Sequence, residues 1–182
     1  MSSFWQKPNK DGKSNHIGKV HAILKGVTTE AFWIHINNIE ENTKKVKNVK
    51  KFEIIERDED GFPKIMYSLA KIPLMTDREN LCRLSKRDLG DGKTLFITQS
   101  IDLPQYPRTK ASIRMDLFKA SIFFQVGPDL ELIEYHTFNM GGYVPAKLLN
   151  MTLGSMMQQG LSQFHKILKD IMVENKLENS TA

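Results

Sequence analysis

The feature that most constrains this chain is a change of hydrophobic period near its C-terminus. In "FNMGGYVPAKLLNMTLGSMMQQGLSQFHKIL", residues 138–168, strand-like residues give way to apolar residues three or four positions apart, the spacing of an amphipathic helix. The apolar positions here and just beyond are Leu149, Leu153, Met156, Met157, Leu161, Phe164, Leu168 and Ile171. A long helix with one apolar face has to bury that face against another layer of the fold.

The preceding residues predict that this layer is an antiparallel sheet. A helix of about three turns is expected over residues 28–42, where Thr28 is a suitable N-cap. Strand-like runs separated by turn residues occupy residues 16–27, 52–74, 80–103, 111–126 and 129–139. Residues 52–74 and 80–103 each predict a hairpin, so we expect roughly six or seven strands. The fold class is α+β, with a curved antiparallel sheet around a long C-terminal helix.

Composition indicates one intracellular domain. The chain has 182 residues, and 40% of them are hydrophobic, which is enough for one core. Its single cysteine, Cys82, excludes an internal disulfide framework and fits a reducing compartment. No run is long enough to span a membrane, and the N-terminus lacks the apolar core of a signal peptide. We expect a cytoplasmic protein that can lie peripherally on membranes, with no organelle excluded.

The net charge of +5 is concentrated in "KKVKNVKK", residues 44–51. Such a run could attract anionic lipid headgroups or nucleic acid. A solvated face is the simpler interpretation and the favoured one. The candidate membrane-contact residues are Lys44, Lys45, Lys47, Lys50 and Lys51.

The sequence gives little support to catalysis or nucleic-acid binding. The five histidines have no metal-binding spacing, and Cys82 has no neighbouring Cys or His partner. "GDGK" lacks the other residues of a phosphate loop and predicts a hairpin turn instead. The aromatic residues lie on apolar strands rather than within a basic cluster. We therefore expect no enzyme, no metal, no cofactor and no nucleic-acid partner.

The segment "FNMGGYVPAKLLN" resembles the motif that begins the C-terminal helix of START lipid-transfer domains. The matching positions are Asn139, Gly141, Gly142, Pro145, Leu148, Leu149 and Asn150. The resemblance extends from about Trp5 to about Val173, and "RLSKRDLGDGKTLFITQSIDLPQYP" is most similar to phosphatidylcholine-transfer-type members. It implies the helix-grip (START/Bet v 1-like) fold, with an N-terminal tail over residues 1–15, a lipid-binding domain over 16–176 and a C-terminal tail over 177–182.

The resemblance also implies a site. A cavity of at least several hundred cubic ångströms, the usual scale of ligand pockets, is expected between the sheet and residues 146–172, with the helix and the loop at residues 101–111 as its lid. By resemblance Arg83 takes the place of an inward arginine, and Ser68 stands where sterol-binding members carry an acid. The implied lipid-binding set is Arg83, Ser68, Leu149, Leu153, Met156, Met157, Leu161 and Phe164. Methionines suit variable acyl chains, but they also fill gaps in ordinary cores.

Two functions follow from these expectations. In the first, the protein binds one lipid, with a phospholipid as the expected class, and carries it between membranes through transient membrane contact. In the second, the same fold has no transfer activity and serves as a structural or regulatory component of a larger protein assembly. A fold alone does not choose between them, because function resides in the site.

Overall fold

The computed structural model describes the backbone of residues 2–7, 16–72, 75–142, 144 and 146–181. Side chains are described within these ranges except for those of residues 2–7, 146–153, 156 and 176–181.

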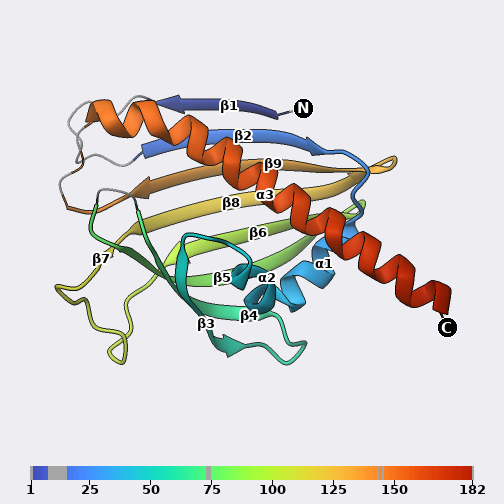
Figure 1. Ribbon diagram of the computed structural model, residues 1–182, viewed down its shortest axis with the longest axis horizontal. Helices are drawn as coiled ribbons and strands as arrows, with labels where there is room; N and C mark the ends of the chain where they lie inside the picture. Colours follow the sequence, from blue (N-terminus) through green and yellow to red (C-terminus); the bar gives the residue numbers. More distant parts are fainter. Residues whose placement is uncertain (1, 8–15, 73–74, 143, 145, 182) are drawn as a thin grey trace.

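Within the described residues, nine strands form one sheet (Figure 1). The strands are β1 (Ser2–Lys7), β2 (His16–Leu24), β3 (Val49–Arg57), β4 (Pro63–Ala70), β5 (Arg78–Gly90), β6 (Lys93–Ser100), β7 (Ile113–Arg114), β8 (Asp116–Val126) and β9 (Asp129–Asn139). Their order is β1-β2-β9-β8-β6-β5-β4-β3, and all neighbours on this path are antiparallel. The short β7 pairs in parallel with β5. The predicted antiparallel sheet is therefore confirmed.

The sheet has more strands than the sequence pattern predicts. Residues 2–7, expected as part of a tail, form β1 and pair along the edge of β2. The two-residue β7 is too short to leave a period in the sequence. β3 begins at Val49, inside the lysine run, because backbone pairing with β4 extends past the apolar residues.

Three helices lie within the described residues: α1 (Thr29–Asn37), α2 (Ile39–Lys44) and α3 (Ala146–Thr181). Thr28 caps α1 as predicted, since its side-chain oxygen accepts a hydrogen bond from the Ala31 amide at 3.3 Å. The helix expected over residues 28–42 is divided into α1 and α2, because Asn38 leaves helical geometry between them. Asparagine disfavours helix interiors by competing for backbone hydrogen bonds.

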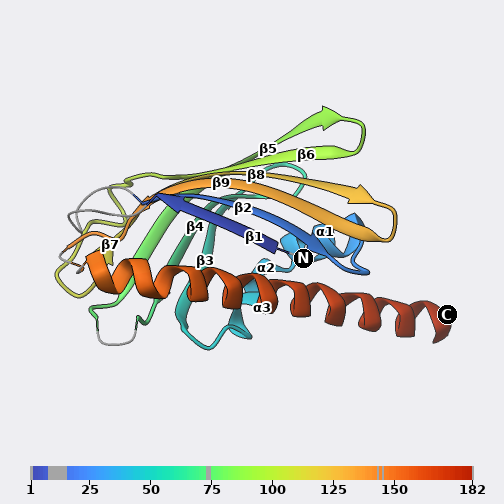
Figure 2. The same cartoon turned by 90° about the horizontal axis from the view of Figure 1, so that it is seen from above.

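The sheet curves around α3, which runs across its concave face (Figure 2). α1 and α2 lie on the same side as α3. No helix within the described residues, α3 included, has the length and apolar character needed to cross a bilayer.

The main core lies where the C-terminal half of α3 meets α1 and the sheet. Ile167, Leu168 and Ile171 of α3 are buried there against residues of β2, α1 and β9. Phe32 of α1 stacks on Phe123 of β8 with ring centroids 4.2 Å apart. Several residues of this core, Phe32 and Phe123 among them, also line a cavity beneath α3.

Candidate functional site

A cavity of about 470 Å³ lies between the concave face of the sheet and α3. Its volume lies within the usual range of ligand sites, roughly 300–1,000 Å³. The helices contribute Phe32, His35, Ile36, Ile39, Met157, Gly160, Leu161 and Phe164. The sheet contributes Val20, Phe52, Met66, Ser68, Asn80, Cys82, Leu84, Phe96, Thr98, Leu117, Lys119, Ser121, Phe123, Leu132 and Glu134. The predicted cavity is confirmed, and most of its lining is apolar.

All three of the predicted lining residues on α3 whose side chains the structure describes lie where they were expected. The cavity lining includes Met157, Leu161 and Phe164, which lie three or four residues apart and therefore on one face of α3. Leu149, Leu153 and Met156 are on α3, but their side chains lie outside the described residues. Their contact with a ligand stays a prediction.

The expected inward position of Arg83 is wrong. Cys82 and Leu84, its neighbours on β5, both line the cavity, whereas the Arg83 side chain is exposed. Successive side chains of a strand point to opposite faces of the sheet, so Arg83 points to the outer face. Ser68 does line the cavity, as predicted, and its partner across β4 and β5 is Asn80.

The loop at residues 101–111 is not a lid in this structure. None of its residues lines the cavity. Tyr106 instead donates a hydrogen bond to Glu53 at 2.9 Å and packs its ring 5.4 Å from that of Tyr67. Both partners alternate with cavity-lining residues, so the loop covers the outer face of the sheet.

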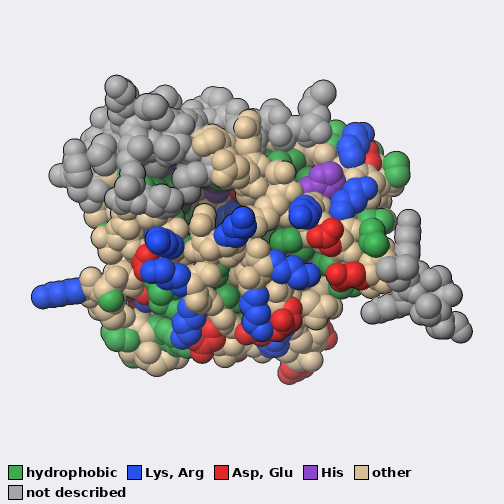
Figure 3. Space-filling model, viewed as in Figure 1, with side chains coloured by type: hydrophobic (Ala, Val, Ile, Leu, Met, Phe, Trp, Pro, Cys, Tyr) green, Lys and Arg blue, Asp and Glu red, His purple; other side chains and the backbone are tan. Residues whose placement is uncertain are grey.

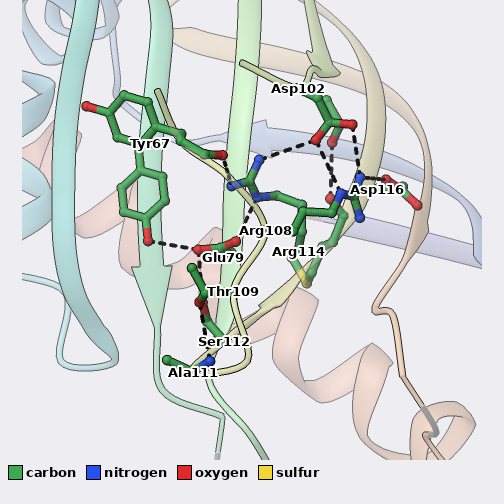
Figure 4. A network of polar contacts seen from close by, with 12 residues as sticks. Tyr67, Glu79, Asp102, Arg108, Thr109, Ala111, Ser112, Arg114 and Asp116 are labelled. Atoms are coloured by element: carbon green, nitrogen blue, oxygen red, sulfur yellow. Dashed lines mark hydrogen bonds and ion pairs between the residues drawn. The ribbon is translucent and has the colours of Figure 1, made fainter. Parts of the chain in front are cut away.

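A buried ion pair ties this loop to the sheet (Figure 4). Arg114 Nε donates to Glu79 at 2.9 Å, and both side chains are almost fully buried. Tyr67 and Ser112 also donate to Glu79, each at 2.9 Å. Burial opposes ionisation of Glu79, but these hydrogen bonds and the Arg114 charge outweigh it and lower its pKa. Arg114 and Asp116 therefore both pair with other side chains, since Asp116 lies 3.5 Å from Arg108.

The Gly-Gly turn before α3 is held by a buried arginine. Arg78 Nε donates to the Met140 carbonyl at 2.8 Å, and its other nitrogens reach the Thr76 and Gly141 carbonyls. Gly141 and Gly142 have φ angles of 65° and 62°, in the left-handed region. The motif noted in the sequence thus forms a tight, anchored turn from β9 towards α3.

A cluster of polar residues inside the cavity was not predicted from the sequence. Lys119 of β8 and Glu134 of β9 both line the cavity, with Lys119 Nζ 3.5 Å from Glu134 Oε2. Ser121 donates to Glu134 at 3.0 Å, and His136 Nδ1 lies 3.2 Å from its other oxygen. In the sequence, the cluster is marked only by charged residues within largely apolar strands. This does not predict the cluster, because the sequence does not say which face of a strand points inward.

Glu134 is ionised within this cluster. Burial alone would raise its pKa, but the Lys119 charge and the hydrogen bonds from His136 and Ser121 outweigh burial and hold the pKa at about 2. The cavity wall therefore contains a carboxylate that is compensated by its own neighbours.

The other polar groups of the cavity are uncharged. Burial lowers the pKa of His35 to about 4, so its imidazole is neutral near pH 7. Asn80 Oδ1 is buried and has no hydrogen-bond partner among the residues that the structure describes. Burial raises the pKa of Cys82, which disfavours a reactive thiolate. Within the described residues no group of three His, Cys, Asp or Glu side chains is placed to hold a metal ion.

The lysine run is exposed but partly paired. Lys44 pairs with Glu41, Lys50 with Asp77, and Lys51 with Glu53. Lys45 and Lys47 are also exposed. Figure 3 shows basic and acidic side chains intermixed over the face that it displays, rather than one continuous basic field. The structure shows where the lysines lie and leaves their membrane contact as a prediction.

Comparisons with known proteins find similarity in structure only. No protein-family model matches the sequence, and no curated protein matches it. Human STARD10 has a TM-score of 0.80 and 15% identity, with 100% of this chain and 74% of that chain covered. Human StAR-related lipid transfer protein 5 has a TM-score of 0.77 and 16% identity, covering 94% and 83%. A STAR-related lipid transfer protein fragment from Xanthomonas axonopodis has a TM-score of 0.69 and 12% identity, covering 91% and 98%. The helix-grip fold is thereby confirmed.

Proposed function

We propose that this protein is a START-type lipid carrier, which binds one lipid in the cavity between the sheet and α3 and moves it between membranes. The main observation in support of the proposal is the apolar cavity of about 470 Å³. It lies where a protein of this size would otherwise have further core side chains. The names of two similar structures, which include lipid transfer, support the same proposal.

The energetics of transfer require such a cavity. Each methylene group removed from water is worth about 0.8 kcal/mol. A lipid leaving a bilayer loses that contribution for every methylene it exposes, so a carrier has to bury the chain as completely as the membrane does. The aromatic and aliphatic wall formed by α1, α3 and the concave face can supply this burial.

The cavity volume favours a lipid with one chain or a similarly compact shape. At about 470 Å³ the cavity lies in the lower half of the usual range for ligand sites, roughly 300–1,000 Å³. Such a volume suits a drug-sized ligand better than the two-chain phospholipid that the sequence resemblance suggests.

Two matched substitutions test the carrier function. Ser68→Trp places a large side chain inside the cavity, whereas Ser85→Trp places the same side chain at an exposed position of β5. Native mass spectrometry of the purified proteins, followed by a vesicle-to-vesicle transfer assay, should show bound lipid and transfer for wild type and Ser85→Trp. The Ser68→Trp protein should be folded but lack both. Equal lipid content and transfer for the two variants would contradict the proposal.

The second candidate function, a non-transferring component of an assembly, is favoured by one observation. Ile17, Phe118 and Tyr135 are exposed large hydrophobic residues on neighbouring strands of the outer sheet face. Exposed apolar patches often mark contacts with other proteins. A wild-type protein that purifies without lipid and gives no transfer would favour this role over the carrier.

A further inference from the structure

The cavity contains one pair of opposite charges among its described lining residues. Lys119 and Glu134 project from adjacent strands onto the concave face, and their side chains approach to 3.5 Å. Most of the remaining lining is apolar. A charged pair in such surroundings is costly to maintain unless it is well compensated, which makes its presence informative.

Glu134 and Lys119 differ in how many hydrogen-bond partners they have among the described residues. Glu134 receives the Ser121 hydroxyl at 3.0 Å and contacts His136 at 3.2 Å, and all three side chains are buried. For Lys119 the described residues show only the longer contact with Glu134, although an ammonium group has three donors. The Lys119 side chain is 38% exposed, and it lines the cavity. Lys119 thus has donors left for an acceptor inside the cavity.

One polar group that can complement such an acceptor lies next to Lys119. Thr98 is its partner on β6 and also lines the cavity. A ligand group that both accepts and donates hydrogen bonds would use the free Lys119 donors and supply a proton to the Thr98 hydroxyl oxygen.

The charge balance decides which polar group fits. Among the described residues that line the cavity, Lys119 and Glu134 cancel each other, and His35 is neutral near pH 7. A bound carboxylate or ammonium would leave an uncompensated charge in an apolar cavity, which is strongly unfavourable. A hydroxyl group adds no charge and has both hydrogen-bonding roles.

We infer that Lys119 and Glu134 form the polar recognition site of the cavity, and that its ligand is an uncharged lipid with a hydroxyl group and one long chain or an equally compact body. This inference rests on the proposed carrier function and adds the class of lipid. Lys119 donates to the ligand hydroxyl, while Glu134 keeps the site electrically neutral.

A competition experiment tests the inference directly. Purified full-length protein is incubated with phosphatidylcholine vesicles that contain equal amounts of oleyl alcohol, oleate and oleylamine, which share one chain and differ in the charge of the polar end. The protein is then separated, and its bound lipids are extracted and quantified by mass spectrometry. Wild type should retain oleyl alcohol at least about tenfold over either charged lipid, because either ion would place an uncompensated charge in the cavity.

Substitutions at the pair should switch this preference. Glu134→Gln leaves the Lys119 charge uncompensated and should favour oleate, whereas Lys119→Met leaves a carboxylate and should favour oleylamine. The double variant Lys119→Met/Glu134→Gln removes both charges and should again disfavour both ions. Arg83→Gln removes a charge from the outer face and serves as the matched control with wild-type preference. Circular dichroism and a cooperative thermal transition establish that each variant is folded.

The outcomes separate this inference from the proposed function. Binding of all three lipids in equal amounts, or a preference that the folded single variants leave unchanged, would overturn the role of Lys119 and Glu134 while leaving the carrier function intact. Retention of none of these lipids, and of no vesicle phospholipid, by folded wild type would overturn both.

Discussion

At the scale of single residues, Gly141 shows why the Gly-Gly motif is present. Its φ angle is 65°, and a Cβ atom there would lie 2.6 Å from Ile113 Cγ2 and 3.1 Å from the Arg114 carbonyl oxygen. Both the backbone conformation and the lack of space therefore require glycine. The same turn carries the carbonyl groups that Arg78 holds.

We predict that Gly141→Ala lowers the free energy of unfolding by about 1–3 kcal/mol, the usual cost of a non-glycine residue in a left-handed conformation. Urea denaturation gives the value. Gly154→Ala is the matched control, because Gly154 lies within α3 and a Cβ there meets no atom within 4 Å. That control should raise stability by about 0.5–1 kcal/mol, since alanine favours helix. Equal effects of the two substitutions would contradict the strain assigned to Gly141.

His35 predicts a dependence of stability on pH. Burial lowers its pKa from 6.5 to about 4 in the folded protein. A lowered pKa contributes stability that is fully present above the unfolded pKa and is lost as pH falls towards the folded one. The loss attributable to His35 between these values is on the order of 3 kcal/mol.

Replacing His35 with Phe should remove this part of the pH dependence. Urea unfolding of wild type and His35→Phe at several pH values from about 7.5 down to about 4 would measure the difference in free energy. The gap between the two proteins should change in favour of the variant as pH falls. A constant gap across this range would show that His35 is not buried as a neutral imidazole.

The residue scale is also where prediction from sequence was least successful. The helical period identified Met157, Leu161 and Phe164 as residues of the apolar face of the helix, and all three line the cavity that the resemblance implied. Arg83 was assigned inward by resemblance, but a shift of one residue along a strand reverses the face. The inward Lys119 and Glu134 come from strands joined by a turn, and only the register of the folded sheet brings them together.

At the scale of elements, α3 has a packed C-terminal half and an N-terminal half that starts after the glycine turn. Leu168 is fully buried in the main core, while Val173, farther along the same helix, is 59% exposed. The apolar period predicted the long helix and its buried face. It did not predict how tightly each part is packed, because that depends on α1 and on the curvature of the sheet.

The contrast along α3 gives a paired prediction. Leu168→Ala should cost about 2–5 kcal/mol of unfolding free energy, as is usual for a large apolar side chain removed from a core. Val173→Ala removes an exposed side chain and should change stability by less than about 0.5 kcal/mol. Thermal or urea unfolding would measure both. A small effect at Leu168 would mean that this half of α3 is not fixed to the sheet.

At the scale of the whole molecule, the charge of +5 is carried mainly by exposed side chains. The lysine run lies at the end of α2 and the start of β3, where the backbone changes from helix to strand. Sequence predicted its exposure but not its ion pairs, which involve acids such as Asp77 that are distant in the chain. The attraction of the run to a membrane depends on where its charges lie as well as on the total charge.

We predict that replacing all five lysines of the run with Gln weakens binding to phosphatidylserine-containing vesicles at low salt by at least about tenfold, because each lysine near an anionic surface is worth about 1 kcal/mol. Co-sedimentation at increasing salt measures the effect. The control replaces five exposed cations elsewhere with Gln, which gives the same net charge; these are Arg83, Arg87, Lys93, Lys110 and Lys166. If both variants lose the same affinity, total charge rather than the run is responsible.

The cavity also has a consequence for how much of the protein a cell contains. With the cavity empty, the protein lacks part of its own interior. Under the proposed function, a bound lipid would stabilise the folded state by an amount that grows with the logarithm of its concentration relative to its dissociation constant. Proteases and chaperones act on the unfolded fraction, so a difference of about 1–2 kcal/mol changes steady-state abundance several-fold. If the proposed function is right, the amount of this protein should rise and fall with the supply of that lipid, even when its rate of synthesis is constant.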